Sequence, residues 1–233
     1  MRLLLLSNSA SDAGYLAHAL DWIAETLGAA RRLAFVPYAA VTVPYDTYAA
    51  RVAEALAPLG VEVEGVHAAA DPAGAVRRSD AVLVGGGNTF HLLREVQRLG
   101  LLDAIGERVA DGGPYVGWSA GANLACPTVR TTNDMPIVEP ASLDALGLVP
   151  VQINPHYTDA HPPGHRGETR AERLAEFVAA NPQTPVVGLP EGTAVRVVGG
   201  SAGVLGGRRA RVFDAASPTG REAAPGEAEA LFA

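Results

Sequence analysis

The chain has 233 residues, of which 48% are hydrophobic and 18% are charged, and its formal net charge is −7. This composition is typical of one globular domain with a well-buried core. The acidic balance leaves no electrostatic footprint for nucleic acid, and the apolar runs are too short for a secretion signal or for a membrane span of about 18 residues.

The sequence contains a single cysteine, Cys126. One thiol cannot form an intramolecular disulfide, and a chain of this kind suits a reducing compartment. We therefore predict a cytoplasmic protein whose partners include neither nucleic acid nor a membrane.

Short apolar runs alternate with helix-like stretches through the first half of the chain. Strands are expected at residues 3–6, 33–36, 61–66, 81–84 and 115–118. Helices are expected at residues 15–27, 45–59 and 101–110, and from the turn at 85–88 towards residue 99. This alternation is typical of parallel βαβ units, so we predict an α/β fold with a mostly parallel sheet sandwiched by helices.

The pattern changes after Glu191. Residues 194–198, 202–205 and 208–213 are short β-like runs separated by glycine-rich turns. They predict a short C-terminal antiparallel meander over 194–213 at the edge of the sheet. Residues 214–233 are expected to form a flexible tail. No linker divides the chain, so residues 1–233 are interpreted as a single domain.

The segment from Gly117 to Gly121 has the pattern Gly-x-Ser-x-Gly and lies between a predicted strand and a predicted helix. In a nucleophile elbow the serine occupies a strained turn at the end of a strand, and this turn requires small neighbours. The pattern therefore predicts Ser119 as a nucleophile, with the backbone N–H of Ala120 directed at a developing oxyanion.

A glycine-rich turn at residues 85–88 ends the strand that precedes this elbow in the sequence. Its free backbone N–H groups would supply a second oxyanion donor, which predicts Gly86 and Gly87 as part of an oxyanion hole. The alternative is a dinucleotide-binding loop. That motif requires Gly-x-Gly-x-x-Gly near the first strand, and here Phe90 occupies the place of the third glycine.

A serine hydroxyl needs an adjacent base. His156 is the best candidate of the six histidines because it follows the apolar strand at 149–153, at the sheet end where α/β folds place their chemistry. A metal site formed by His156, Asp159, His161 and His165 is the alternative. Two prolines between these histidines exclude the regular helix that would align them, so we expect neither a metal nor a cofactor.

The imidazole of a triad needs an acid that fixes its tautomer. Asp134 lies in a polar segment between the predicted Ser119 helix and the His156 strand, and it is the leading candidate. Glu191 follows another predicted strand and is the alternative. Sequence spacing does not choose between them.

Four segments together resemble peptidase E, the aspartyl dipeptidase family, whose relatives include cyanophycinase. They are GGGNTF at 85–90, GWSAGAN at 117–123, TTNDMPI at 131–137 and INPHYTDAHPPGHRGETR at 153–170. They occur in the family's order through the middle of the chain. GWSAGAN is shared with relatives, whereas TTNDMPI together with NPHYTD is far more specific.

The resemblance implies a fold like that of class I glutamine amidotransferases, hydrolysis of dipeptides that begin with aspartate, and a homodimer. It implies that Ser119 is the nucleophile and His156 the base. Asp134 matches the acid traditionally assigned in the family, whereas cyanophycinase-like members use a glutamate, which keeps Glu191 open. Ala120 fits the oxyanion hole, as does Gly86.

An aspartyl side chain requires a cation that can bind a carboxylate bidentately, and arginine has this geometry. Arg170 ends the last matching segment and is the first choice, with Asn88 and Thr131 as polar helpers. Arg130 and Arg166 are alternatives.

Three other functions remain open at this point. A cyanophycinase-like enzyme would release β-linked aspartyl dipeptides. An α/β-hydrolase esterase would have its histidine late in the chain and an HGG-type loop early, and neither is present. A non-catalytic amidotransferase-like binding module would not need a serine, a base and an acid together.

Overall fold

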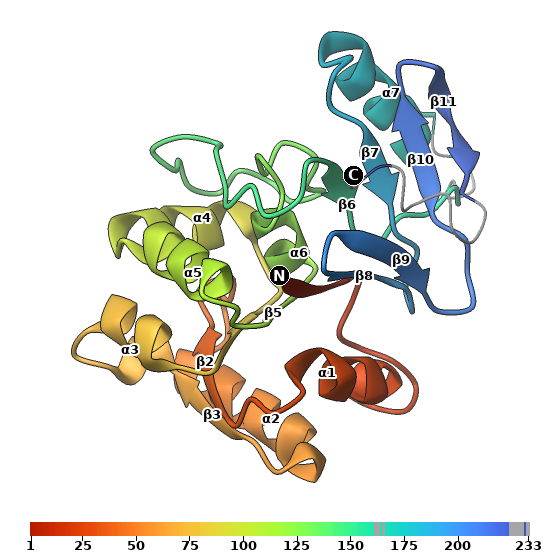
Figure 1. The fold of residues 1–233 in the computed structure, drawn as a ribbon. Coiled ribbons are helices and arrows are strands. Elements are labelled where there is room, and N and C mark those ends of the chain that lie inside the picture. Colours follow the sequence, from red (N-terminus) through yellow and green to blue (C-terminus); the bar gives the residue numbers. More distant parts are fainter. Residues whose placement is uncertain (161–163, 165, 224–230, 232–233) are drawn as a thin grey trace.

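The computed structural model describes residues 1–160, 164, 166–223 and 231. Its main sheet has seven strands in the order β3-β2-β4-β5-β1-β8-β9 (Figure 1). These strands are β1 (Arg2–Leu6), β2 (Arg32–Val36), β3 (Glu62–Gly65), β4 (Ala81–Val84), β5 (Tyr115–Trp118), β8 (Ala194–Val198) and β9 (Ser201–Leu205). The first five in this order run parallel, and β8 and β9 complete the sheet with antiparallel pairings.

The α-helices are α1 (Leu20–Leu27), α2 (Tyr45–Leu56), α3 (Pro72–Arg78), α4 (Thr89–Arg98), α5 (Leu101–Ala110), α6 (Ala120–Leu124) and α7 (Arg170–Ala180). Short 3-10 helices occur at Ala17–Ala19, Ala57–Leu59 and Val66–Ala68. The predicted α/β fold, with its mostly parallel sheet between helices, is confirmed. None of the helices in the described part of the chain has the length and hydrophobicity needed to cross a membrane.

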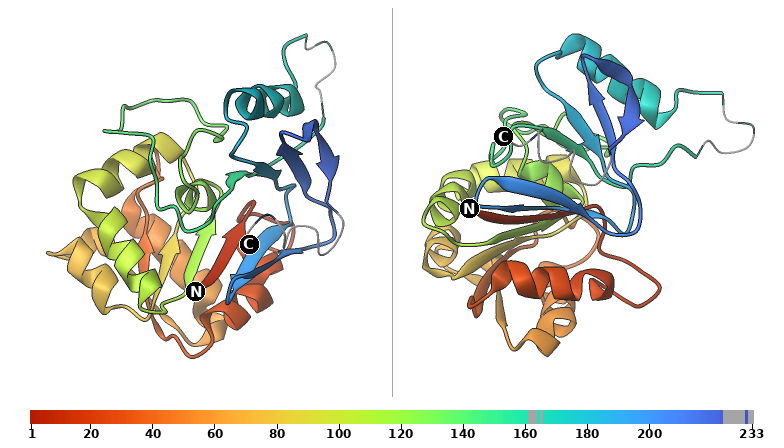
Figure 2. Two further views of the ribbon diagram at one scale, coloured as in Figure 1. Left: turned by 45° about the horizontal axis from the view of Figure 1, so that its top comes forward. Right: turned by 45° about the vertical axis from the view of Figure 1, so that its right-hand side comes forward.

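The central strands of the main sheet contribute side chains to two cores because successive side chains point to opposite faces. Leu4 and Leu6 of β1 pack in the core shared with α1 and α2, whereas Leu3 and Leu5 pack in the core shared with α4, α5 and α6. Figure 2 shows α1 and α2 on one side of the main sheet. Strands buried on both faces explain the nearly continuous apolar run of Leu3–Leu6.

A second sheet has the order β11-β10-β7-β6 and lies with α7 beyond the edge of the main sheet (Figures 1 and 2). It consists of β6 (Gln152–Asn154), β7 (Val186–Gly188), β10 (Arg211–Asp214) and β11 (Ser217–Glu222). Strands β6 and β7 are parallel, with Asn154 beside Gly188 in the register. Their carboxyl ends therefore lie together, and they point towards the carboxyl end of β1 because Ser7 donates a hydrogen bond to the carbonyl of Leu189.

Two expectations about the C-terminal region need correction. The edge meander is formed by β8 and β9, but β10 pairs with β7 in the second sheet instead of extending the main one. The expected flexible tail from 214 is ordered as far as Ala223, because β11 pairs with β10 and the Asp214 carboxylate accepts a hydrogen bond from the amide of Ser217 at the turn. Residues 224–230 and 232–233 lie outside the described residues.

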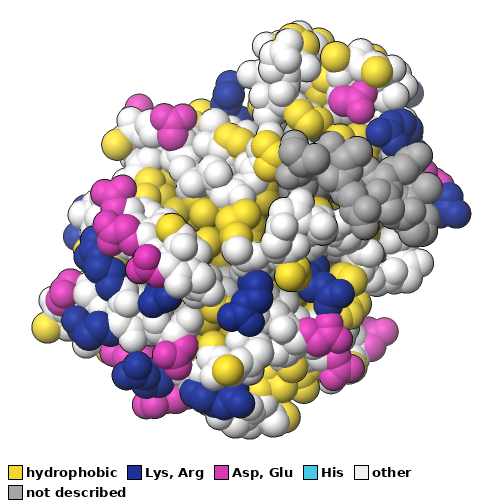
Figure 3. All heavy atoms as spheres, viewed as in Figure 1, with side chains coloured by type: hydrophobic (Ala, Val, Ile, Leu, Met, Phe, Trp, Pro, Cys, Tyr) yellow, Lys and Arg dark blue, Asp and Glu magenta, His cyan; other side chains and the backbone are white. Residues whose placement is uncertain are grey.

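On the face shown in Figure 3, arginine side chains are interspersed with acidic ones, and apolar side chains lie between them near the middle of the view. Salt bridges such as Arg77–Glu107 and Arg98–Glu95 join the two signs on the described surface.

Candidate active site

Ser119 occupies the sharp turn between β5 and α6. Its φ of 52° and ψ of −111° lie in a region that residues with a side chain rarely adopt. The backbone N–H of Ser119 donates to the carbonyl of Leu6 on the neighbouring strand, 3.0 Å away. Strained backbone of this kind persists only where the surrounding structure enforces it, and it is concentrated at functional sites.

The glycines of the Gly-x-Ser-x-Gly pattern are required by close backbone contacts. A Cβ on Gly117 would lie 2.4 Å from the carbonyl oxygen of Gly121, and a Cβ on Gly121 would lie 2.2 Å from the carbonyl oxygen of Val84. Both distances are far below van der Waals contact. Helix α6 can therefore begin directly after Ser119 only with glycine at these two positions.

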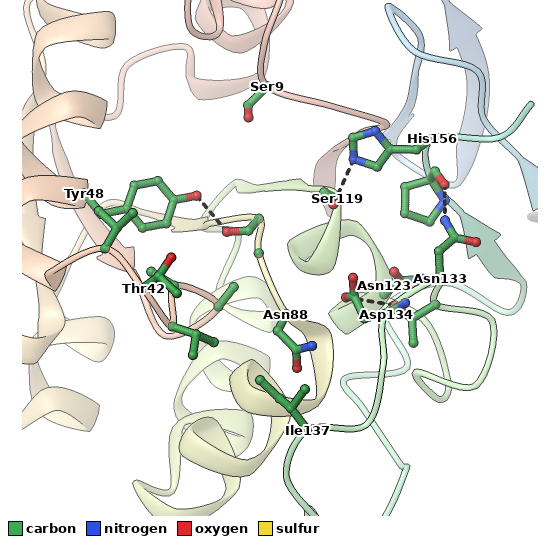
Figure 4. Close-up of a pocket in the computed structure, with 18 of the residues that line it drawn as sticks. Ser9, Thr42, Tyr48, Asn88, Ser119, Asn123, Asn133, Asp134, Ile137 and His156 are labelled. Carbon is green, nitrogen blue, oxygen red and sulfur yellow. Dashed lines mark hydrogen bonds between the residues drawn. The ribbon is translucent and has the colours of Figure 1, made fainter.

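The imidazole of His156 lies between Ser119 and Glu191. Its Nε2 is 3.1 Å from the Ser119 Oγ (Figure 4). Its Nδ1 is 2.7 Å from the Glu191 Oε1. A carboxylate only accepts hydrogen bonds, so Nδ1 carries the proton and Nε2 is free to accept from the serine hydroxyl. The geometry is that of a serine, a base and an orienting acid.

Asp134 lies in a different part of the pocket. Its carboxylate accepts hydrogen bonds from the backbone N–H of Thr89 at 2.7 Å and from the Thr89 hydroxyl at 2.6 Å, and the Thr132 hydroxyl donates to it at 3.1 Å. Among the described residues, the acid hydrogen-bonded to His156 is Glu191 and not Asp134. The structure thus joins the alternative acid, and not the leading one, to the imidazole.

The glycine-rich turn after β4 lies against the elbow, as expected. A Cβ on Gly86 would lie 3.0 Å from the Cβ of Ser119, and the Tyr48 hydroxyl donates to the Gly86 carbonyl at 3.0 Å. Within the described part of the chain, the amides of Gly86, Gly87 and Ala120 donate to no protein acceptor. These three N–H groups are therefore not used by protein acceptors, and Gly86 lies directly beside Ser119.

A pocket of about 840 Å³ opens over Ser119. Its described lining residues include two arginines, Arg51 and Arg170, one carboxylate, Asp134, and the imidazole of His156. The aliphatic side chains of Val41, Val43 and Ile137 contribute apolar walls. Figure 4 shows Tyr48 and Thr42 on the side of the pocket opposite His156. Two cationic side chains and one carboxylate suit a small ligand that carries both signs of charge.

Arg170 is half-buried at the start of α7, and burial lowers the pKa of its guanidinium. Its Nη1 donates to the carbonyl of His156 at 2.6 Å, which leaves other N–H groups of the fork for a ligand. The alternatives Arg130 and Arg166 do not line the pocket. Arg130 donates to the side chain of Asn181, and Arg166 is exposed.

The two predicted polar helpers lie in different surroundings. Asn88 lines the pocket, caps α4 by accepting from the amide of His91 at 3.0 Å, and donates to the carbonyl of Met135 at 2.9 Å. Thr131 is buried, and its hydroxyl donates to the carbonyl of Ile153 at 2.9 Å. The neighbouring Thr132 lines the pocket in its place.

The alternative metal site falls mostly outside the part of the chain that can be described. His161 and His165 are not among the described residues. Among the residues that are, no group of three or more histidine, cysteine, aspartate or glutamate side chains could hold a metal ion.

Several residues around the site gave no sequence signal of their own. Tyr48 lies on α2, and its hydroxyl accepts from the Trp118 indole at 3.0 Å while donating to Gly86. Ser7 and Asn8 follow β1 and have the composition of an ordinary turn. Only the three-dimensional contact between β1 and the ends of β6 and β7 shows that they adjoin the site.

Comparison with known proteins identifies the family of the chain. The model of peptidase family S51 matches residues 3–205. The chain is 52% identical over 233 residues to "Peptidase E" of Citrobacter koseri, with 100% of each chain covered. It is 54% identical over 208 residues to "Peptidase E" of Salmonella typhimurium, which covers 89% of this chain and 90% of that one.

Solved structures share the fold. A putative peptidase E from Listeria monocytogenes superposes with a TM-score of 0.66 at 24% identity, covering 89% of this chain and 98% of that one. A peptidase from an acI-B1 actinobacterium gives a TM-score of 0.66 at 16% identity, covering 97% and 95%. Given the full-length relatives at about 52% identity, the chain belongs to peptidase family S51 and is a serine peptidase.

Proposed function

We propose that the protein is a dipeptidase that cleaves dipeptides with an N-terminal aspartate, with Ser119 as nucleophile, His156 as general base and Glu191 as the acid that orients His156. The observation that carries the proposal is the continuous hydrogen-bonded series from the Ser119 hydroxyl through the imidazole to the Glu191 carboxylate, with distances of 3.1 and 2.7 Å.

The proposed reaction proceeds through an acyl-enzyme. The Ser119 Oγ attacks the carbonyl carbon of the aspartyl residue, and its proton passes to Nε2 of His156. The amides of Gly86, Gly87 and Ala120 stabilise the negative oxygen of the tetrahedral intermediate. The imidazolium then protonates the departing amine, and a water molecule activated by the same imidazole hydrolyses the ester.

The charges that line the pocket complement those of the proposed substrate. We assign the side-chain carboxylate of the substrate to Arg170, because a planar guanidinium binds a carboxylate through two hydrogen bonds. We assign its α-ammonium group to Asp134, the acidic side chain among the lining residues. This assignment gives Asp134 a role in binding in place of the orienting role that its sequence position suggested.

A substrate panel tests the proposal. Asp-Leu and Asp-p-nitroanilide are expected to be cleaved far faster than Asn-Leu, which lacks the negative charge, and than a p-nitrophenyl ester. Preferential cleavage of β-aspartyl dipeptides or cyanophycin would instead establish the cyanophycinase-like alternative. Turnover of none of these compounds, combined with stoichiometric binding of one, would favour the non-catalytic module.

Replacing Arg170 with alanine is expected to lower kcat/KM for Asp-p-nitroanilide by about 30–150-fold. This factor corresponds to the loss of about 2–3 kcal/mol, the contribution of a hydrogen bond to a charged group. Ala-p-nitroanilide, which has no side-chain carboxylate, should be affected much less. Steady-state kinetics on both substrates measures the difference, with Arg130→Ala as the control because Arg130 does not line the pocket.

Arg170 also donates to the carbonyl of His156, so its removal could disturb the base. Labelling of Ser119 by a fluorophosphonate, which has no aspartyl group, separates the two effects. An equal loss with both p-nitroanilide substrates and a slower labelling rate would contradict the binding role.

We further propose that the enzyme acts in the cytoplasm as a homodimer. Cys126 is a buried free thiol, which suits a reducing compartment. The dimer follows from the family resemblance, and light scattering coupled to size-exclusion chromatography would measure the mass directly.

A further inference from the structure

Leu6, Ser7 and Asn8, at and just beyond the carboxyl end of β1, contact the backbone of Ser119, of His156 and of the residue that follows Glu191. The carbonyl of Leu6 accepts from the backbone N–H of Ser119 at 3.0 Å. The Ser7 hydroxyl accepts from the backbone N–H of His156 at 2.8 Å. The Asn8 side-chain oxygen accepts from the N–H of Gly192, the residue after Glu191, at 2.8 Å. Three consecutive residues therefore contact three segments that are far apart in the sequence.

Ser7 is completely buried, and its hydroxyl both donates and accepts a hydrogen bond. While accepting from His156, it donates to the carbonyl of Leu189 at 2.8 Å. Leu189 directly follows β7, and its carbonyl also accepts from the amide of Tyr157 at 2.8 Å. One hydroxyl thus ties the segment that carries the base to the segment that carries the acid.

His156 needs this support because its backbone is strained. Its φ is 52°, in the left-handed region that non-glycine residues seldom occupy. Such a conformation persists only where neighbouring groups hold it. Ser7 holds the N–H of His156 on one side, and Arg170 holds its carbonyl on the other. Without Ser7, the direction of the imidazole would no longer be fixed from the N–H side.

Glu191 needs backbone support for a different reason. Its side chain is 61% exposed, so packing does little to orient the carboxylate. The next residue, Gly192, has a φ of +80° and forms part of the turn that leads into β8. Asn8 binds the N–H of Gly192 and also donates to the carbonyl of Ala10 at 2.6 Å, which fixes its own amide.

We infer that Ser7 and Asn8 are positioning residues that hold His156 and Glu191 in register with Ser119. The inference rests on the proposed triad. Ser7 acts through the backbone of His156, and Asn8 acts through the turn that carries Glu191. Neither side chain is assigned a contact with substrate.

Single substitutions give the first test. Ser7→Ala is expected to lower kcat for Asp-p-nitroanilide about 100-fold with little change in KM, because a displacement of about 1 Å at the reacting groups has an effect of this size. Asn8→Ala is expected to lower kcat by less than this, because Asn8 binds the residue after Glu191 and not a reacting group. Ser79→Ala is the matched control, since Ser79 is also buried and its hydroxyl donates to the carbonyl of Val76 at 2.8 Å. It should keep the parent kcat.

A double-mutant cycle separates positioning from general structural support. If Asn8 acts through Glu191, adding Asn8→Ala to Glu191→Ala should leave kcat unchanged, whereas a purely structural effect would lower it by the same factor as in the parent. The parallel cycle adds Ser7→Ala to His156→Ala. Circular dichroism identifies any variant that does not fold. If Ser7→Ala does not fold, the Asn8 cycle alone tests the positioning role.

The outcomes are distinguishable. Loss of activity in Ser119→Ala and Glu191→Ala with parent-like kcat in folded Ser7→Ala and Asn8→Ala would overturn the positioning role and leave the triad intact. Full additivity in the Asn8 cycle would overturn it as well. Retained activity in Ser119→Ala would instead overturn the proposed function itself.

Discussion

Ser119→Ala is expected to reduce kcat by about 10⁴–10⁶-fold while the protein folds normally. In the proposed reaction this side chain supplies the attacking atom, and the Ser119 Oγ lies 3.1 Å from the imidazole Nε2. Alanine tolerates the same backbone conformation as serine, so the elbow should keep its shape. Initial rates with Asp-p-nitroanilide and a thermal unfolding curve measure the two quantities.

Two controls make this result interpretable. A fluorophosphonate should label the parent protein on Ser119 and should not label the variant. If Ser119→Ala kept one tenth of the parent kcat, the nucleophile would have to be a different group. The residual rate in the variant reports what the oxyanion amides and substrate binding contribute on their own.

Glu191→Ala should lower kcat about 10³-fold. Loss of a buried orienting acid in a comparable triad costs about 10⁴-fold, and the Glu191 side chain is 61% exposed, so water can partly replace it. The loss should lie in kcat and not in KM, because the carboxylate bonds Nδ1 of His156 and Glu191 is not among the residues that line the pocket. Kinetics at saturating substrate measures it directly.

Asp134→Ala provides the comparison, and its effect should differ in kind. We expect it to raise KM for Asp-p-nitroanilide with a smaller change in kcat, because its carboxylate bonds Thr89 and Thr132 and lines the pocket. If instead Asp134→Ala lost several orders of magnitude in kcat and Glu191→Ala did not, Asp134 would be the orienting acid and the assignment would reverse.

The positions of Ser119 and His156 could be read from the sequence because each follows a recognisable strand. Reactive groups of α/β folds lie at the carboxyl ends of strands, so the position of a residue that follows a strand can be predicted. The acid could not be chosen in this way. Asp134 lies in the long segment between Leu124 and Gln152, which contains no helix or strand, and its course depends on tertiary contacts.

The second sheet was beyond sequence reasoning for a related reason. Apolar periodicity identifies a strand but does not say which sheet the strand joins. Residues 217–222 have the sequence SPTGRE, with a proline and a glycine that disfavour strands. Pairing with β10 overrides that preference. The positioning role inferred for Ser7 could not be predicted for the same reason, since it depends on strands that are distant in sequence.

The tight contacts of Gly117 and Gly121 explain what the Gly-x-Ser-x-Gly pattern records. Each glycine lies where the start of a helix and a neighbouring strand approach so closely that a Cβ would clash with backbone atoms. Any strand-to-helix turn with equally close backbone contacts would require glycine at these positions, whether or not a base lay beside the serine. The glycines thus reflect the packing of the turn. The reactivity of the serine depends instead on where the fold places the imidazole.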